Sequence, residues 1–310
     1  MKSEHLLSIT LRISKKARQP GTTFGITGTI ACWLVLLVVI PAVADETLIA
    51  VSYNIRQDTA SDTEARDWQS RKGALTRYLL DGKFSIIGLQ EVRHKQLLDV
   101  DRALPEHKFT GVGRDDGKTR GEYSPIYFHA DSWKLDPEQH GTFWLSDTPD
   151  VIRSRTWGNR YPRICTWARL IGLNGPFKGE AIYVFNTHWD HQSQPSRLKS
   201  AQLILKTIAS RTYKNEPVLL MGDFNATTDN PAIKSLLSSS LVIDHGKKQL
   251  STGSKWKPEL VSGLRIDHIF TSPQFTEATL KVELNPGVKG LSASDHHPVV
   301  LRTKIPVQTK

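Results

Sequence analysis

The chain has 310 residues, enough for one large layered domain with its own core. Its formal net charge of +10 is compatible with an anionic substrate, but no Lys/Arg-rich block has the density of a nucleic-acid-binding arm. No internal repeat and no low-complexity tract is visible, which excludes a solenoid architecture.

The first 44 residues have the pattern of a secretory signal peptide. The apolar run Ile30–Ile40 follows basic residues and is too short to span a bilayer comfortably. Pro41 breaks the run, and Ala42-Val43-Ala44 supplies the small residues that a signal peptidase recognises, so we expect cleavage before Asp45. The alternative is an uncleaved anchor, because the basic leader is long for a signal peptide. Cys32 precedes most of the apolar run, which argues against a lipoprotein anchor.

Residues 45–310 are therefore predicted to form a single exported domain, periplasmic or secreted, with no stable membrane insertion after cleavage. Residues 1–44 hold five of the 41 basic residues and one of the 31 acidic ones, so an excess of about six positive charges remains. Cys165 is then the only cysteine, and the core must hold together by apolar packing without an internal disulfide. Its strand-like neighbours indicate a small buried hydrophobe in preference to a nucleophile.

Two apolar strands early in the domain end in polar side chains. Residues 48–53 lead into Asn54, and residues 84–89 lead into Glu91; helix-forming residues occupy 62–80 between them. A carboxylate beside a buried strand costs several kcal/mol unless a cation or hydrogen-bond donors meet it. We therefore expect Glu91 to bind a metal ion, with an edge salt bridge to Arg93 or another base as the alternative.

The middle of the chain, residues 110–190, alternates apolar and polar positions as the strands of two sheets would. Arg114 lies in a predicted charged turn, and Glu122 and Tyr123 lie at the start of a strand. Another strand in this region ends at His188. A single histidine at a strand end is usually structural, but this is the third apolar strand that ends in ionisable side chains.

The apolar run Val218–Met221 predicts a strand buried on both faces, and it stops at Gly222. Asp223 and Asn225 follow, two residues apart, so in extended backbone they point the same way. Such a pair can hold a hard cation or a phosphoryl oxygen. The alternative is an Asx-rich turn that caps the strand.

Further elements surround this strand. Apolar spacing predicts a helix over 196–211, and Asn230-Pro231 has the pattern of another helix start. Near the C-terminus, two polar segments adjoin apolar strands and contribute Asp267 and the pair Asp295-His296.

These segments together resemble the endonuclease/exonuclease/phosphatase superfamily, the deoxyribonuclease-I-like metal phosphohydrolases. The matching motifs span essentially all of residues 47–302 and are SYNIR, LQEV, GEYSPIYF, FNTHWDH, LLMGDFN, RIDHIF and SDHHPV. QE, GDFN and SDH in this order are specific together, although each alone is weak. The resemblance implies an α/β fold, a four-layer sandwich of two packed mixed β-sheets flanked by helices, with the active site at one edge.

The resemblance also implies a metal centre and a general base. Glu91 would be the principal Mg²⁺ or Mn²⁺ ligand, with Asn54 beside it and Asp295 assisting on the metal side. His296 would activate the attacking water, oriented by Asp267. A carboxylate-backed imidazole and a cation supply the base and the charge neutralisation that phosphate-ester hydrolysis needs.

By the same resemblance, Asp223 and Asn225 would position the nucleophile and stabilise the pentacovalent phosphorus. His188, paired with Glu122, would hydrogen-bond the phosphoryl oxygens.

Three further residues are candidates for substrate binding, namely Arg56, Arg114 and Tyr123. Arg56 stands where the abasic-site DNA-repair branch of the superfamily has an acid, which disfavours that activity. It would contact a substrate phosphate or, alternatively, pair with an acid at the surface.

The sequence therefore predicts an exported, divalent-metal-dependent phosphoesterase that cleaves a P–O bond by direct attack of water. A small phosphodiester or phosphomonoester is the preferred substrate, because GRDDGKTRGEYSPIYF and PRICTWARL resemble bacterial members of the superfamily without assigned substrates. The alternatives are a secreted nuclease acting on DNA or RNA, and a binding module that has lost the chemistry.

Overall fold

The computed structural model describes residues 47–246, 251–260, 262–285 and 287–305. The expected signal peptide, residues 1–44, lies outside the described residues. Within them, no helix combines the length and the apolar character needed to cross a membrane.

The described chain forms twelve strands, four α-helices and two short 3₁₀ helices. The strands are β1 (Thr47–Asn54), β2 (Ile86–Gln90), β3 (His107–Thr110), β4 (Ile126–His129), β5 (Trp133–Trp144), β6 (Ile164–Gly172), β7 (Ala181–His188), β8 (Val218–Asp223), β9 (Ile243–Asp244), β10 (Asp267–Thr271), β11 (Thr276–Val282) and β12 (Val299–Lys304). The helices are η1 (Glu64–Arg66), α1 (Trp68–Asp81), α2 (His94–Ala103), η2 (Gly175–Phe177), α3 (Gln194–Ser210) and α4 (Pro231–Leu237).

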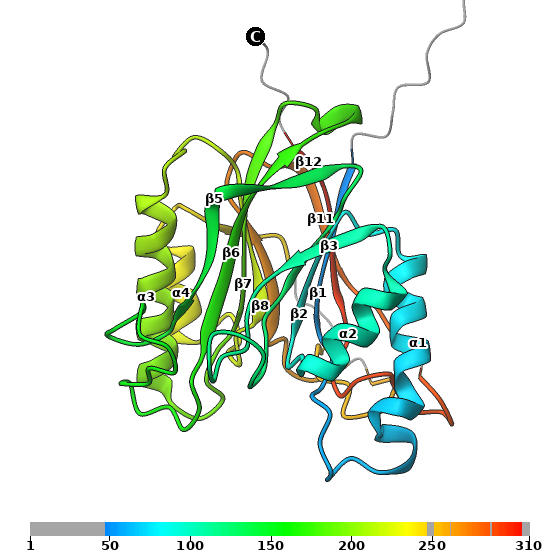
Figure 1. Ribbon diagram of the computed structural model, residues 1–310. Helices are drawn as coiled ribbons and strands as arrows, with labels where there is room; N and C mark the ends of the chain where they lie inside the picture. The colour runs from blue at the N-terminus through cyan, green and yellow to red at the C-terminus, as the bar shows by residue number, and fades with distance from the viewer. Residues whose placement is uncertain (1–46, 247–250, 261, 286, 306–310) are drawn as a thin grey trace, which may run out of the picture. The chain divides into compact units, whose positions relative to one another are not determined.

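The strands form two six-stranded mixed sheets, with the orders β11-β12-β1-β2-β4-β3 and β5-β6-β7-β8-β10-β9. In Figure 1 the two sheets lie face to face, with α1 and α2 outside the first and α3 and α4 outside the second. This is the four-layer α/β sandwich that the sequence predicted. The pair β1 and β2 is parallel, and so is the pair β7 and β8, so their carboxyl ends lie at corresponding edges of the sheets.

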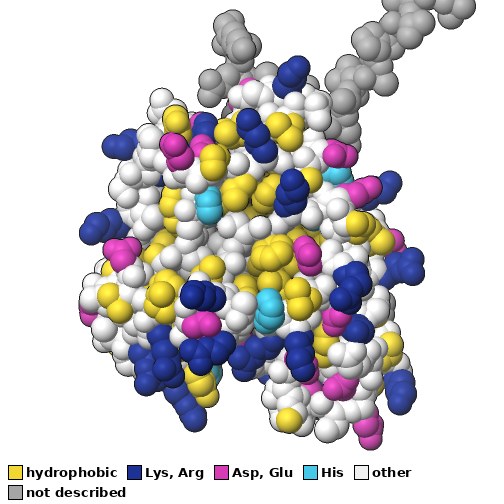
Figure 2. Space-filling model, in the orientation of Figure 1, with side chains coloured by type: hydrophobic (Ala, Val, Ile, Leu, Met, Phe, Trp, Pro, Cys, Tyr) yellow, Lys and Arg dark blue, Asp and Glu magenta, His cyan; other side chains and the backbone are white. Residues whose placement is uncertain are grey.

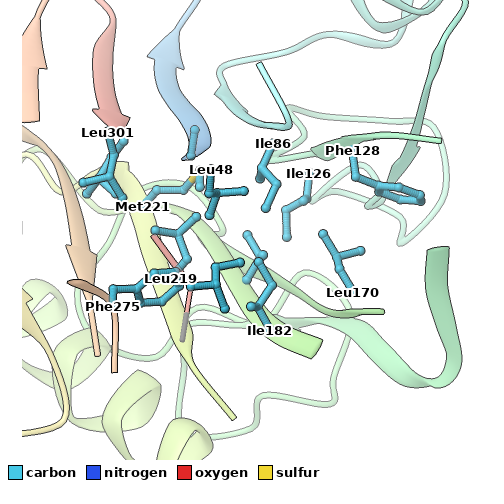
Figure 3. Packing of buried hydrophobic residues seen from close by; sticks show 14 of the residues in the cluster. Leu48, Ile86, Ile126, Phe128, Leu170, Ile182, Leu219, Met221, Phe275 and Leu301 are labelled. Atoms are coloured by element: carbon cyan, nitrogen blue, oxygen red, sulfur yellow. The ribbon is translucent and has the colours of Figure 1, made fainter. Parts of the chain in front are cut away.

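Alternation of side chains along each strand divides the core into layers. In β8, Leu219 and Met221 belong to the cluster between the sheets, whereas Val218 and Leu220 pack towards α3 and α4. Figure 3 shows the layer between the sheets, where Leu48 and Ile86 of the first sheet face Leu219 and Met221 of the second. Because both faces are buried, these strands are continuous apolar runs, as expected.

The helix boundaries differ slightly from the sequence-based expectation because capping side chains set them. Asp67 accepts a hydrogen bond from the backbone N–H of Gln69, so α1 begins at Trp68, after a separate 3₁₀ turn, and not at 62. Ser193 caps α3 in the same way, which moves its start to Gln194. The expected helix start at Asn230-Pro231 is confirmed, with the Asn230 side chain capping α4.

A buried polar clamp holds the two sheets together beside the edge where β1 and β2 end. Gln90 Nε2 donates to Asn186 Oδ1 across the sheets at 2.7 Å. Asn186 Nδ2 in turn donates to the carbonyl oxygens of Leu89 and Pro125, at 2.8 Å each. Both side chains are fully buried, so these bonds specify how the strand ends of the two sheets face each other.

Candidate active site

Sharp turns direct the site residues towards one another at the carboxyl ends of three strands. Arg56, Glu91 and Asn225 follow β1, β2 and β8, and all three have left-handed backbone, with φ of 58°, 61° and 47°. Non-glycine residues with positive φ are uncommon and are found at functional turns. The extended backbone expected at Asn225 is therefore wrong, although Asp223 and Asn225 both line the cavity described below.

Asp223 both forms an Asx turn and presents a carboxylate oxygen to the site, so both interpretations of this strand end from the sequence apply. Asp223 Oδ1 accepts a hydrogen bond from the backbone N–H of Asn225 at 2.9 Å, which closes an Asx turn. Its other oxygen, Oδ2, accepts from Asn54 Nδ2 at 3.0 Å. Gly222 is required just before it, because a Cβ there would lie 2.1 Å from the carbonyl oxygen of Thr187 in the paired strand.

A histidine and two aspartates meet where the antiparallel strands begin. The register places Asp267 of β10 directly opposite Asp223 of β8. His296, just before β12, has its Nδ1 2.8 Å from Asp267 Oδ2 and its Nε2 3.9 Å from Asp223 Oδ2. Burial alone would lower the pKa of His296, but the neighbouring carboxylates, chiefly Asp267, raise it well above its usual value.

Asn54 connects the two carboxylates that lie at the ends of β2 and β8. Its Nδ2 donates to Glu91 Oε1 at 3.1 Å as well as to Asp223. Glu91 Oε2 accepts from the backbone N–H of Gln57 at 3.0 Å. Within the described part of the chain, Glu91 has no basic side chain within 4.0 Å, so the alternative of a salt bridge to Arg93 is wrong.

Two groups of side chains in this region suit a divalent cation. The carboxylates of Glu91 and Asp223 both accept from the Asn54 amide, and this neutral group does not compensate their negative charge. One ligand atom each of Asp223, Asp267 and His296 also lie within 4.8 Å of one another. Asp267 Oδ1 is buried and has no hydrogen-bond partner among the described residues. Carboxylate oxygens and imidazole are donors that suit Mg²⁺ or Mn²⁺.

The other predicted metal-side residues have partners of their own. Asn54 Oδ1 accepts from the backbone N–H of Arg56 at 2.9 Å, so this side chain holds the two carboxylates in place. Asp295 Oδ2 lies 3.8 Å from Arg56 Nη1, and Asp295 is not among the residues that line the cavity described below.

His188 lies between two acids. Its Nε2 is 3.5 Å from Asp223 Oδ2, and its Nδ1 is 3.7 Å from Glu122 Oε2. Glu122 is held by Arg114, whose Nη1 and Nη2 donate to its two oxygens at 2.7 and 2.8 Å. Burial opposes ionisation of Glu122, but His188 and Arg114 favour it, and the pKa of Glu122 falls to about 2. The expected pairing of Glu122 with His188 is thus present at 3.7 Å.

The candidate substrate-binding residues take different positions. Arg56 lines the cavity, and its guanidinium binds Asp62 at 2.9 and 3.1 Å, so it does pair with an acid as the alternative proposed. Arg114 lines the cavity with its charge paired to Glu122.

Tyr123 is buried, lies outside the cavity lining, and donates its hydroxyl hydrogen to the carbonyl oxygen of Lys118 at 2.8 Å. The structure therefore gives no support to substrate contact by Tyr123.

All of the predicted catalytic side chains except Asp267 open onto one cavity of about 420 Å³. Its lining consists of Arg56, Gln57, Glu91, Arg93, Arg114, Asp115, Glu122, Tyr161, Arg163, His188, His191, Asp223, Asn225 and His296. Asp267 lies behind His296 and is fully buried. Figure 2 shows Lys and Arg side chains gathered at the lower left and lower centre of the molecule, and the lower side is also where β1 ends in Figure 1.

Sequence reasoning missed several cavity residues that come from loops. Gln57, Arg93, Asp115, Tyr161 and Arg163 were not assigned to the site, and no strand-end pattern marks them. His191 was not assigned to the site either; it lines the cavity and accepts a hydrogen bond from Arg163 Nη2 at 2.9 Å.

Other side chains that could have belonged to the site are structural. His297 contacts the carbonyl oxygen of Leu260 at 2.9 Å and lies outside the cavity. Trp144, Trp157 and Trp189 are buried, so they are core residues and not an exposed stacking surface.

The profile of the Endonuclease/Exonuclease/phosphatase family matches residues 51–296. The chain belongs to this family. Members are phosphoester hydrolases and are generally dependent on divalent metal ions, so the predicted family and enzyme class are confirmed. The donor sets around Glu91, Asp223 and His296 are consistent with that dependence.

Two solved structures from Bacteroides thetaiotaomicron resemble most of the chain. An endonuclease/exonuclease/phosphatase family protein is 32% identical with a TM-score of 0.77, covering 84% of this chain and 98% of that chain. A mannosyl-6-phosphatase of strain VPI-5482 is 32% identical with a TM-score of 0.74, covering 83% and 99%. Among curated proteins, the probable RNA exonuclease NGL3 of Saccharomyces cerevisiae is 26% identical over 203 residues, 61% of this chain. The chain spans 38% of that yeast protein's length.

Proposed function

We propose that the protein is a divalent-metal-dependent phosphoesterase that hydrolyses a small phosphate ester by direct attack of water on phosphorus. One observation carries the proposal: the His296–Asp267 hydrogen bond lies at the same cavity as the Asn54-bridged carboxylates Glu91 and Asp223. The first pair provides a base and the second a place for a cation, and hydrolysis of a phosphate ester needs both.

His296 acts as the base in this proposal. Its Nδ1–H donates to Asp267, which fixes the tautomer and leaves Nε2 directed towards Asp223 and the cavity. Nε2 of the neutral imidazole takes the proton from the attacking water, and the Asp267 carboxylate stabilises the imidazolium that forms. A cation held by Glu91 and Asp223 would favour the neutral imidazole, because its charge opposes the carboxylates that raise the pKa of His296.

Glu91 and Asp223, held by Asn54, would bind the cation. When bound, the cation supplies positive charge where negative charge develops on the phosphoryl group. His188 and Asn225 line the same cavity and would donate to the phosphoryl oxygens. Asn225 Nδ2 donates one hydrogen bond to the carbonyl oxygen of Trp189 at 3.1 Å, which leaves its second N–H for this role.

A small ester is favoured over a polymer on two grounds. The cavity volume of about 420 Å³ suits a small molecule. A protein 32% identical over 83% of this chain is named a mannosyl-6-phosphatase, so a sugar phosphate is the first substrate class to test. A nuclease remains the second candidate, because the yeast relative at 26% identity is named a probable RNA exonuclease.

Export is a separate proposal that rests on the N-terminal sequence alone. N-terminal sequencing of the protein purified from the periplasm or medium of a bacterial host should give Asp45 as the first residue. Recovery of the uncleaved chain in the membrane fraction would instead support the anchor.

The substrate class is tested with a panel measured under identical conditions with Mg²⁺ and with Mn²⁺. It comprises p-nitrophenyl phosphate, bis(p-nitrophenyl) phosphate, hexose 6-phosphates, and single-stranded RNA and DNA. We expect phosphate release from the monoesters and the sugar phosphates. Cleavage of nucleic acid with no release from small esters would replace the proposal by the nuclease alternative, and no turnover of any member would contradict both.

A further inference from the structure

The cavity contains one arginine whose charge is not matched by an acid. Of the four arginines in its lining, Arg56 pairs with Asp62, Arg114 with Glu122, and Arg163 with Asp190 at 3.4 Å. Arg93 has no carboxylate within 4.0 Å in the described part of the chain. Its Nε donates to a neutral acceptor, Gln57 Oε1, at 3.1 Å.

The position of Arg93 is fixed from both its main chain and its side chain. Arg93 is the residue that precedes α2, and its backbone N–H donates to Gln96 Oε1 at 3.0 Å. The bond to Gln57 restrains the guanidinium. The other N–H groups of the guanidinium have no hydrogen-bond acceptor among the described residues. A half-buried guanidinium that lines a cavity is well suited to bidentate binding of an anion.

Gln57 also joins Arg93 to Glu91, the carboxylate that has no basic side chain within 4.0 Å among the described residues. The backbone N–H of Gln57 donates to Glu91 Oε2 while its side chain accepts from Arg93. The acid without a basic partner and the base without an acidic partner are therefore neighbours in the same wall of the cavity. A cation at Glu91 would compensate the negative charge of this carboxylate, and a phosphoryl group beside that cation would compensate the positive charge of Arg93.

We propose that Arg93 binds a non-bridging oxygen of the substrate phosphoryl group and so selects phosphate monoesters over diesters. The inference rests on the proposed phosphoesterase function and narrows its substrate class. A monoester presents three non-bridging oxygens and two negative charges, whereas a diester replaces one of those oxygens by a second ester group and keeps one charge. With a diester, the guanidinium faces an uncharged substituent and is left unpaired.

The test compares Arg93→Gln with a matched change of charge outside the cavity, Arg77→Gln, at an exposed position of α1. The measured quantity is kcat/KM for p-nitrophenyl phosphate and for bis(p-nitrophenyl) phosphate, with Mg²⁺. Loss of one charged hydrogen-bonding group should lower kcat/KM for the monoester by roughly 10- to 100-fold. We expect less than about a 3-fold change for the diester and no change on either ester for Arg77→Gln. An equal loss on both esters, or no loss, would overturn the inference.

Binding of inorganic phosphate, measured by calorimetry with Mg²⁺, separates this inference from the proposed function. If the wild type hydrolyses neither ester but binds phosphate more tightly than Arg93→Gln does, Arg93 binds the anion and only the proposed hydrolytic function is contradicted. If the wild type hydrolyses the monoester and both proteins bind phosphate equally, the proposed function stands and only the inference about Arg93 is contradicted. Absence of both hydrolysis and phosphate binding in the wild type contradicts both.

Discussion

Asp267 accepts a hydrogen bond from His296 at 2.8 Å, and the strand register sets the same aspartate opposite Asp223. Asp267 is fully buried and does not line the cavity, so it acts on the reaction through His296. Nδ1 of His296 is therefore fixed by Asp267, and Nε2 is directed at the cavity.

Asp267→Asn should reduce kcat for a phosphate monoester by roughly 10²- to 10⁴-fold, because the neutral amide stabilises neither the correct tautomer nor the imidazolium. Asp150→Asn, the same change at an exposed acid, is the control and should leave kcat unchanged. Thermal unfolding of both variants checks that the fold is intact. A fully active Asp267→Asn enzyme would remove Asp267 from the mechanism.

Glu91→Gln should abolish stabilisation by divalent ions. Glu91 has no basic partner within 4.0 Å among the described residues, so a bound cation adds a favourable interaction that the apo protein lacks. At a hundred times its Kd, a ligand that binds only the folded state stabilises by about 2.7 kcal/mol. We expect Mg²⁺ or Mn²⁺ to raise the Tm of the wild type and of the control Glu138→Gln, at an exposed acid, but not that of Glu91→Gln. The same metal-dependent shift in all three proteins would show that Glu91 is not a ligand.

His268 should make the protein less stable in mild acid. Burial, assisted by Arg265, lowers the pKa of His268 from 6.5 to about 4, because its imidazole is packed between Phe224 and Phe270. A folded-state pKa below the unfolded one means that the neutral form stabilises the fold above pH 6.5. That contribution is lost as pH falls from 6.5 to about 4, and it amounts to about 3 kcal/mol.

The measurement is the free energy of unfolding in urea between pH 7 and pH 4, for the wild type and for His268→Phe. The phenylalanine fits the aromatic cluster but loses the contact to the carbonyl oxygen of Ala226, so it should be less stable at pH 7 and vary less with pH. Parallel pH profiles for the two proteins would exclude His268 as the source of the acid sensitivity.

Cys165 should resist thiol reagents in the folded protein. It is fully buried, and burial raises the pKa of its thiol well above the usual range. Iodoacetamide labelling followed by peptide mass spectrometry should find the Cys165 peptide unmodified in buffer and modified in guanidinium chloride. Labelling of the native protein at a rate similar to that of the unfolded chain would contradict this burial.

Much of the site could be predicted because its residues lie at the ends of buried strands or next to them. An apolar run such as Val218–Met221 marks a strand, and the polar residue after it must lie at the strand's end, near the ends of parallel neighbours. Asp267 is the first residue of β10 and His296 precedes β12, but β10 and β12 are antiparallel to β8 and β1, so their starts lie at the same edge. Strand direction thus brought residues from distant segments together.

Other parts of the site depend on details that the residue pattern does not carry. Tyr123 follows Glu122 directly, and neighbours in extended backbone point to opposite sides, so Glu122 faces the cavity while Tyr123 enters the core. Arg93 and Tyr161 come from loops, whose paths are set by tertiary contacts. The unmatched charge of Arg93 depends on the tertiary contacts that pair Arg56, Arg114 and Arg163 with acids, and these are not visible in the residue pattern.

The most direct test of the central claim is hydrolysis of p-nitrophenyl phosphate by the wild type and by His296→Ala, each with Mn²⁺, with Mg²⁺ and with a chelator. His140→Ala, at an exposed histidine of β5, is the control. The account predicts turnover by the wild type and the control that needs metal, and a loss of at least about 10²-fold in His296→Ala. Turnover that persists in the chelator, or that is unchanged in His296→Ala, would contradict it.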